Sequence, residues 1–125
     1  MRGRPLLAIS LAAAFTLVGT SCLSPTLPLP PPEDDSIVQT VDGRWSIAGS
    51  CHVGAIVTVF NQTQGQGLVV EDRDLTGRFV VKLQANLCDV GWISQQIVGD
   101  EPSESATFVV EPKTPNTTGS STICK

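Results

Sequence analysis

The clearest alternation of apolar and polar residues in this chain runs through residues 78–85, RFVVKLQA. The apolar members share one face and the polar members the other: Phe79, Val81 and Leu83 against Arg78, Lys82 and Gln84. A period of two places successive side chains on opposite faces of a strand. The stretch therefore predicts a β-strand with one buried face and one face in water.

Similar short runs of β-forming residues lie on both sides of this stretch. They cover residues 37–41, 44–49, 55–60, 68–72, 91–98 and 106–111. Turn-forming residues separate them, and Asp42-Gly43 is a strong hairpin signal. No window has convincing helical periodicity. Strands at such regular spacing predict an all-β fold, a single antiparallel Ig-like β-sandwich of about seven strands over residues 37–112.

Three segments resemble the bacterial immunoglobulin-like (Big) domains of adhesins and surface proteins. They are residues 49–59, GSCHVGAIVTV; residues 74–79, DLTGRF; and the series Gln95, Gly99 and Ser103. The resemblance implies a β-sandwich that acts in adhesion or binding. Cys51, Cys88 and the single copy depart from the usual tandem pattern. The same turns also resemble those of a transthyretin-like regulatory sandwich, which is the alternative variant of this fold.

The first 21 residues have the composition of a bacterial signal peptide. Arg2 and Arg4 form a basic start, and residues 6–18 are almost wholly apolar. These 13 residues are fewer than the ~20 that a transmembrane helix needs. We therefore expect export with removal of residues 1–21.

Small residues precede Cys22 in Gly19-Thr20-Ser21-Cys22, which resembles a lipobox. The resemblance implies a lipoprotein whose acylated Cys22 holds it in a membrane. Leu23 in place of Asp favours the outer membrane or cell surface, by analogy with sorting signals. Because Gly19 and Ser21 also suit ordinary secretory cleavage, a secreted protein with a free Cys22 is the alternative.

Residues 22–36 follow the leader and contain no apolar periodicity. Five of the 14 residues at positions 23–36 are proline, which favours a polyproline II spacer of roughly 40 Å at about 3.1 Å per residue. Residues 113–125 are rich in Thr, Ser, Asn and Pro, and we expect a flexible tail there. The predicted organisation is thus leader, lipidated tether, sandwich and tail.

The charge balance argues against nucleic acid as a partner. The full chain has a net charge of −4. Without Arg2 and Arg4, six basic residues remain against twelve acidic ones, a net charge of −6. Such a domain offers no basic surface for a phosphate backbone. We expect an envelope protein or a glycan as partner.

The four cysteines leave two disulfide pairings open. If Cys22 is acylated, Cys51, Cys88 and Cys124 remain. Three strands separate Cys51 from Cys88, which puts them at opposite ends of a sandwich and favours Cys88–Cys124, because bridged Cα atoms must lie within about 7 Å. If the 68–72 run does not cross the domain, Cys51–Cys88 becomes feasible. We prefer Cys51–Cys88 because both cysteines lie inside the domain.

Catalytic residues are not apparent, so we predict a non-enzymatic protein without cofactors. His52 is the one histidine, and no nucleophile can be given both a base and an orienting group. Glu71, Asp72 and Asp74 are weak candidates for Ca²⁺, since this ion needs six to eight oxygen ligands. An acidic turn explains the same residues.

Trp45 and Trp92 are the candidate binding residues. Each lies in an apolar run, where an indole is usually part of the core. If exposed, either could stack on a sugar ring and form a carbohydrate-binding face. The sequence thus predicts a non-catalytic envelope lipoprotein for adhesive, structural or accessory binding, with a secreted carbohydrate- or ligand-binding module as the alternative.

Overall fold

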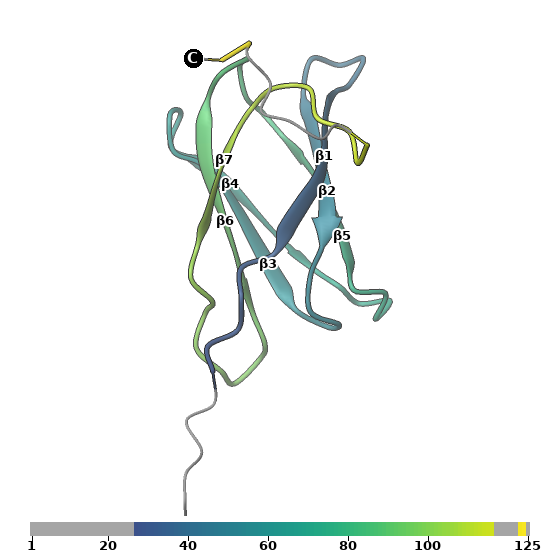
Figure 1. The fold of residues 1–125 in the computed structure, drawn as a ribbon, viewed down its shortest axis with the longest axis vertical. Coiled ribbons are helices and arrows are strands. Elements are labelled where there is room, and N and C mark those ends of the chain that lie inside the picture. Colours follow the sequence, from purple (N-terminus) through teal and green to yellow (C-terminus); the bar gives the residue numbers. More distant parts are fainter. Residues whose placement is uncertain (1–26, 117–122, 125) are drawn as a thin grey trace, which may run out of the picture.

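The computed structural model describes residues 27–116 and 123–124, and seven strands lie among them (Figure 1). The strands are β1 (Glu33–Gln39), β2 (Trp45–Ser50), β3 (Ile56–Asn61), β4 (Gln66–Glu71), β5 (Arg78–Leu83), β6 (Val90–Gln96) and β7 (Ala106–Val109). The described residues contain no helix, so none could span a membrane. The predicted all-β fold class is confirmed.

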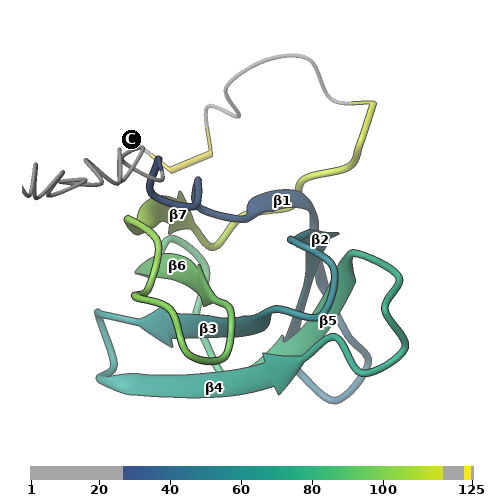
Figure 2. The same cartoon turned by 90° about the horizontal axis from the view of Figure 1, so that it is seen from below.

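Two antiparallel sheets pack face to face to form the sandwich (Figure 2). One sheet has the order β1-β2-β5, and the other has the order β4-β3-β6-β7. This places the fourth strand in the second sheet, beside the third, as in Ig-like domains that extend the sheet of strands C, F and G.

The core fills the space between the sheets with the inward residues of each strand. In β5 burial alternates at every residue, because Phe79, Val81 and Leu83 point inward, whereas Val80 is exposed on the outer side. The cluster consists of aliphatic and aromatic residues from both sheets and from the strand ends: Ile37, Trp45, Ile47, Val57, Val59, Phe79, Val81, Leu83, Ala85, Ile93, Phe108 and Val110. Burying such apolar surface is the main force that holds the two sheets together.

Strand β1 begins at Glu33, four residues before the predicted domain start. The acidic end of the predicted tether is therefore part of the sheet, and the tether boundary at residue 36 is wrong. Glu33 and Asp34 pair with Ser50 and Gly49 of β2, and the register shifts between Asp34 and Ser36. The hydrogen bonds between strand backbones need no apolar side chains, so apolar periodicity could not reveal the start of β1.

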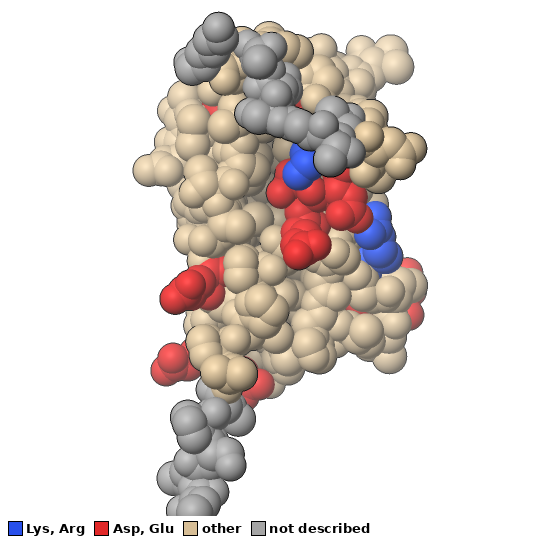
Figure 3. Space-filling view, in the orientation of Figure 1, with Lys and Arg blue, Asp and Glu red and all other residues tan. Residues whose placement is uncertain are grey.

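Ion pairs fasten this acidic segment to its neighbours. Lys113 Nζ lies 2.9 Å from Asp34 Oδ2, and Arg78 pairs with Asp35. Figure 3 shows acidic and basic side chains gathered on the surface at the place where β1 runs in Figure 1. Carboxylates within the predicted tether thus form ion pairs that anchor the first strand.

The chain after β7 returns to the sandwich. The backbones of Ile37 and Lys113 exchange two hydrogen bonds. Ile37 N donates to Lys113 O at 3.0 Å, and Lys113 N donates to Ile37 O at 2.9 Å. Further along, Cys124 is bonded to Cys88. The prediction of a free tail is thus wrong for Lys113 and Cys124, while residues 117–122 and 125 lie outside the described residues.

The disulfide joins Cys88 and Cys124, whose Cα atoms are 5.4 Å apart. Cys51 has a free thiol, so the preference for Cys51–Cys88 is wrong. Strand β4 pairs along the whole length of β3 and so crosses the domain. Three full strands then carry the chain from Cys51 to the opposite end, where Cys88 N donates to Val110 O.

Candidate functional site

Trp45 and Trp92 occupy different environments in the sandwich. Trp45 is 3% exposed and belongs to the core cluster, so it is not a surface for stacking sugars. Trp92 is half-buried on β6, with its side chain on the outer side of the four-stranded sheet. Of the two predicted binding candidates, Trp92 alone is placed to meet a large partner.

Trp92 stacks on Phe60 of the neighbouring strand. The two residues are directly opposite in the β3–β6 ladder, with ring centroids 5.3 Å apart and an interplanar angle of 29°. Gly67 of β4 is opposite Phe60 on the other side, and a Cβ there would lie 2.7 Å from Phe60 Cδ2. The missing side chain at Gly67 thus leaves room for the Phe60 ring.

Further apolar side chains surround this pair on the outer side of the sheet. The strand registers put six of them on one surface, which we name the outer apolar face: Ile56, Phe60, Val69, Val90, Trp92 and Val109. Val69 is 66% exposed and Val90 is 39% exposed. Exposed apolar side chains that share one sheet face are candidates for an interaction site.

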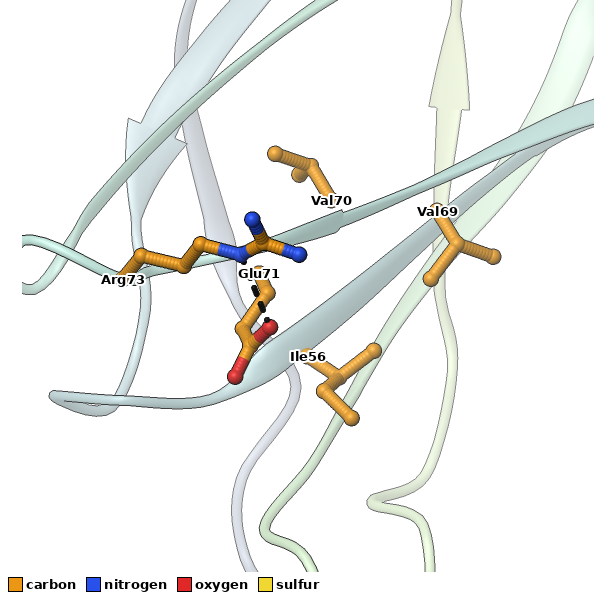
Figure 4. A pocket seen from close by; sticks show the side chains of 5 residues that line it. All are labelled: Ile56, Val69, Val70, Glu71 and Arg73. Atoms are coloured by element: carbon orange, nitrogen blue, oxygen red, sulfur yellow. Dashed lines mark hydrogen bonds and ion pairs between the residues drawn. The ribbon is translucent and has the colours of Figure 1, made fainter.

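A shallow hollow of about 500 Å³ lies at the β4 edge of this face. Figure 4 shows the side chains that line it: Ile56, Val69, Val70, Glu71 and Arg73. Arg73 reaches back over β4, and its Nε lies 3.2 Å from Glu71 Oε2. The hollow is therefore lined by three aliphatic side chains and by one exposed ion pair.

The carboxylate of Asp72 accepts hydrogen bonds from three residues of the protein. Its Oδ2 accepts hydrogen bonds from Gly54 N at 3.1 Å and Gly77 N at 2.7 Å, and its Oδ1 accepts from the N and Oγ1 of Thr76. The hydrogen bond from Gly54, followed by those from Gly77 and Thr76, outweighs burial and lowers the pKa of Asp72. The carboxylate fixes the loops before β3 and β5.

The described residues hold no group of three or more His, Cys, Asp or Glu side chains with metal-binding geometry. Glu71 is engaged with Arg73, and Asp74 is exposed. The weak Ca²⁺ prediction for Glu71, Asp72 and Asp74 is therefore not supported by their placement. The alternative reading of an acidic turn describes these residues better.

Cys51 and His52 do not form a nucleophile and its base. Burial, and then the negative charge of Asp72, raise the pKa of the Cys51 thiol. A raised pKa disfavours the reactive thiolate. The exposed His52 ring lies with Nδ1 3.1 Å from the carbonyl oxygen of Val53.

A buried carboxylate that the sequence pattern did not reveal organises the opposite end of the sandwich. Asp89 Oδ2 accepts hydrogen bonds from Asn61 Nδ2 at 2.9 Å, Gln64 Nε2 at 2.7 Å and Asn86 N at 2.9 Å. Burial opposes its ionisation, but these hydrogen bonds outweigh burial and lower the pKa of Asp89. Its partner Asn61 is fully buried at the end of β3, and nothing in the sequence distinguishes Asp89 from an ordinary turn residue.

No family model, no curated protein and no solved structure matches this chain. A functional proposal for this protein therefore rests on the residues described above.

Proposed function

We propose that this protein is a non-catalytic, exported lipoprotein that uses one Ig-like β-sandwich as a protein-binding module. In this proposal, Cys22 is acylated and holds the domain at the outer membrane or cell surface. The likeness of three segments to bacterial Ig-like domains supports the binding role. The observation that carries it is the outer apolar face with its stacked Phe60–Trp92 pair.

The two outer surfaces of the sandwich differ in composition. The outer side of β2 and β5 has mostly small, polar or charged residues: Ser46, Ala48, Ser50, Arg78, Val80 and Lys82. The outer side of β3 and β6 instead has Ile56, Phe60 and Trp92 among Thr58, Ser94 and Gln96. Aromatic side chains are enriched at protein interfaces, so the four-stranded sheet is the better contact surface.

Presentation of this face fits an anchor at the N-terminal end. The chain enters β1 at one end of the sandwich, and Cys88 and Cys124 lie at the other end (Figure 1). The outer apolar face runs along the side between the two ends. A protein in the same envelope layer could therefore reach it without passing the anchor.

Two experiments separate the anchor from the binding face. The first compares membrane partition of Cys22→Ala with that of Cys51→Ala in the native host, and unchanged partition of Cys22→Ala would contradict lipidation. The second places a photo-crosslinking residue at Thr58 on the outer apolar face or at Lys82 on the opposite sheet. We expect a discrete envelope-protein adduct from Thr58 that Trp92→Ala abolishes, and none from Lys82. Equal crosslinking from both positions would contradict the proposal that the outer apolar face is the binding surface.

Carbohydrate binding through Trp92 is the second candidate. The half-buried indole favours it, since an exposed aromatic face can stack on a sugar. However, Phe60 already stacks on this indole. Titration of the protein with envelope polysaccharide, with Trp92 fluorescence as the signal, tests it. A saturable change that Trp92→Phe removes would support a glycan in place of a protein partner.

A further inference from the structure

Strand β4 forms an edge of the four-stranded sheet, and its far side is open. Among the described strands, β3 alone pairs with β4, and Figure 2 shows β4 at the border of its sheet. Five of its six residues are exposed, and the sixth is half-buried. The unpaired N–H and C=O groups along such an edge can form hydrogen bonds with a strand of another chain.

The hydrogen bonds at the ends of β3 show which backbone groups of β4 point to the open side. Asp72 N donates to Ala55 O at 3.0 Å, on the side of β3 that faces β4. Gln62 N donates to Val90 O at 2.9 Å, on the side that faces β6. Because alternate residues of an antiparallel ladder bond to opposite neighbours, the even-numbered residues of β4 bond to β3. The residues whose backbone groups point to the open side are Gly67, Val69 and Glu71.

The other three edges of the sandwich have features that discourage pairing with another chain. Strand β1 has three carboxylates, a register shift and the backbone hydrogen bonds to Lys113. Strand β5 has Arg78 and Lys82 on its outer side, and β7 has four residues only. Charges, bulges and short length are the usual protection of free edges. Over residues 66–70, QGLVV, strand β4 has no charge, no proline and no register shift.

A second copy of β4 fits this edge in an antiparallel register that engages all three outward-pointing residues. In this register Val69 lies opposite Val69 of the second copy, on the two-fold axis. Gly67 is then opposite Glu71, and Leu68 is opposite Val70. Aliphatic side chains therefore meet aliphatic side chains, and each carboxylate meets a glycine. Such cross-strand pairs stabilise a sheet, whereas like charges placed directly opposite each other would destabilise it.

The ion pair at the end of β4 leaves this edge accessible. The Arg73 side chain is 84% exposed, so it can move without a loss of buried contacts. Glu71 O accepts a hydrogen bond from Arg73 N at 2.9 Å. A carbonyl oxygen has two lone pairs, so Glu71 O can accept a second hydrogen bond from another strand.

We propose that two copies of this protein pair through their β4 edges, antiparallel and in this register, and form a closed two-fold dimer. The two four-stranded sheets then become one continuous sheet. Because β4 is the one edge without protection among the described strands, each copy satisfies the other and assembly stops at two. Phe60 and Trp92 stay on the outer side of the sheet in both copies. The dimer is therefore independent of the proposed partner of the outer apolar face.

Hydrogen exchange of the ¹⁵N-labelled full chain, at a low and a high protein concentration, tests the register. We expect the amides of Gly67, Val69 and Glu71 to exchange at least about tenfold more slowly in the dimer, because they gain their partners only there. The amides of Leu68 and Val70 bond to β3 in both states and should change less. Equal protection of all five amides in a dimer, or no change up to the highest attainable concentration in a monomer, would overturn the proposal.

Sedimentation equilibrium of a matched pair of variants, Val69→Lys and Val80→Lys, tests the edge. Both replace an exposed valine on an edge strand, since Val69 is 66% exposed and Val80 is 59% exposed. Val69→Lys places two ammonium groups together on the two-fold axis and should leave a monomer, whereas Val80→Lys should dimerise like the parent protein. Dispersed amide spectra establish that both variants are folded. A parent mass that rises beyond two chains, or a dimer that Val69→Lys leaves intact, would contradict the proposal.

Cysteine crosslinking in the native host identifies the occupant of the edge without a charged substitution. In a Cys51→Ser background, Val69→Cys should form a disulfide-linked dimer, because Cα atoms of a hydrogen-bonded antiparallel pair lie about 5.5 Å apart, within the range of a disulfide. Val80→Cys should not. An adduct with a different protein, or no adduct, would overturn pairing with a second copy. Addition of Trp92→Ala should retain the crosslink, so this dimer and the proposed envelope partner can fail separately.

Discussion

The side-chain amide of Gln95 donates a hydrogen bond to the carbonyl oxygen of Pro30, at an Nε2···O distance of 2.7 Å. Its Oε1 accepts a second hydrogen bond from His52 N, also at 2.7 Å. Gln95 itself is 4% exposed, and both of these hydrogen bonds are partly buried. One side chain on β6 thus ties the incoming chain and the loop between β2 and β3 to the second sheet.

The main chain of Gln95 also closes the loop between β6 and β7. Gln95 N donates to Ser103 Oγ at 2.9 Å, and Ser103 N donates to Gln95 O at 2.7 Å. The Gln95 and Ser103 positions that resemble bacterial Ig-like domains therefore have a direct structural role. They hold the end of the sandwich at which the chain enters.

Gln95→Leu should destabilise the fold by about 1–3 kcal/mol, because His52 N and Pro30 O lose their buried partner. The measurement is urea unfolding, with hydrogen exchange at the His52 amide as a local probe. Gln96→Leu is the matched control, since Gln96 makes its hydrogen bond to Asp100 O at an exposed position. Equal effects of the two variants would contradict the role assigned to Gln95.

Loss of the disulfide should cost about 2–4 kcal/mol of unfolding free energy, since the bond closes a long loop. The loop joins residues 36 positions apart. The variant is Cys88→Ser/Cys124→Ser, measured by guanidinium unfolding against the oxidised protein. Cys51→Ser should retain the oxidised stability, because Cys51 is not bonded. A large loss in Cys51→Ser with no loss in the double variant would show that a different pair forms.

The stability contributed by Asp72 should depend on pH. Its folded-state pKa lies below the ordinary value of 3.8. This contribution is fully present above the unfolded-state pKa and is lost as the pH falls through the folded-state pKa. Asp72→Asn should therefore be clearly less stable than the parent near neutral pH, with the difference shrinking in acid. Chemical unfolding across the acid range measures it, with the exposed Asp74→Asn as control. A difference that stays constant through the acid range would contradict this linkage.

Gly49→Ala should disturb the start of β1. A Cβ at residue 49 would lie 1.8 Å from Glu33 O and 2.8 Å from Glu33 C, so the backbone of β1 would have to move. We expect a loss of about 1–3 kcal/mol, in the range of overpacked sites, together with faster hydrogen exchange at residues 33–36. Ala48→Ser, on the outer side of the same strand, is the control. Unchanged hydrogen-exchange protection of residues 33–36 in Gly49→Ala would show that the backbone of β1 does not pack closely against Gly49.

The positions of most strands along the chain could be predicted from local pattern. The alternating stretch at residues 78–85 corresponds to β5 (Arg78–Leu83), and Asp42-Gly43 lies between β1 and β2. Alternation and turn chemistry act over a few neighbouring residues, so they can be read directly from the chain. The start of β1 could not be read in this way, because Glu33 and Asp34 join the sheet through backbone groups and ion pairs.

The candidate sites were less predictable than the fold. Trp45 and Trp92 lie in similar apolar runs, yet Trp45 faces the other sheet and Trp92 faces outward. Which face of a strand is covered depends on the register and on the sheet that the strand joins. Asp72 and Asp89 also gain their partners from distant segments, so neither could be told from an ordinary acidic loop residue.

Residue pattern alone specified an all-β chain of about seven antiparallel strands, because strand periodicity and turns are local properties. Packing settled the rest: the Cys88–Cys124 bond, the buried indole of Trp45 and the outer apolar face. Each of these depends on distances between residues that are far apart in the chain. Those distances are set by the path of every intervening strand, and in particular by β4, which crosses the whole domain beside β3.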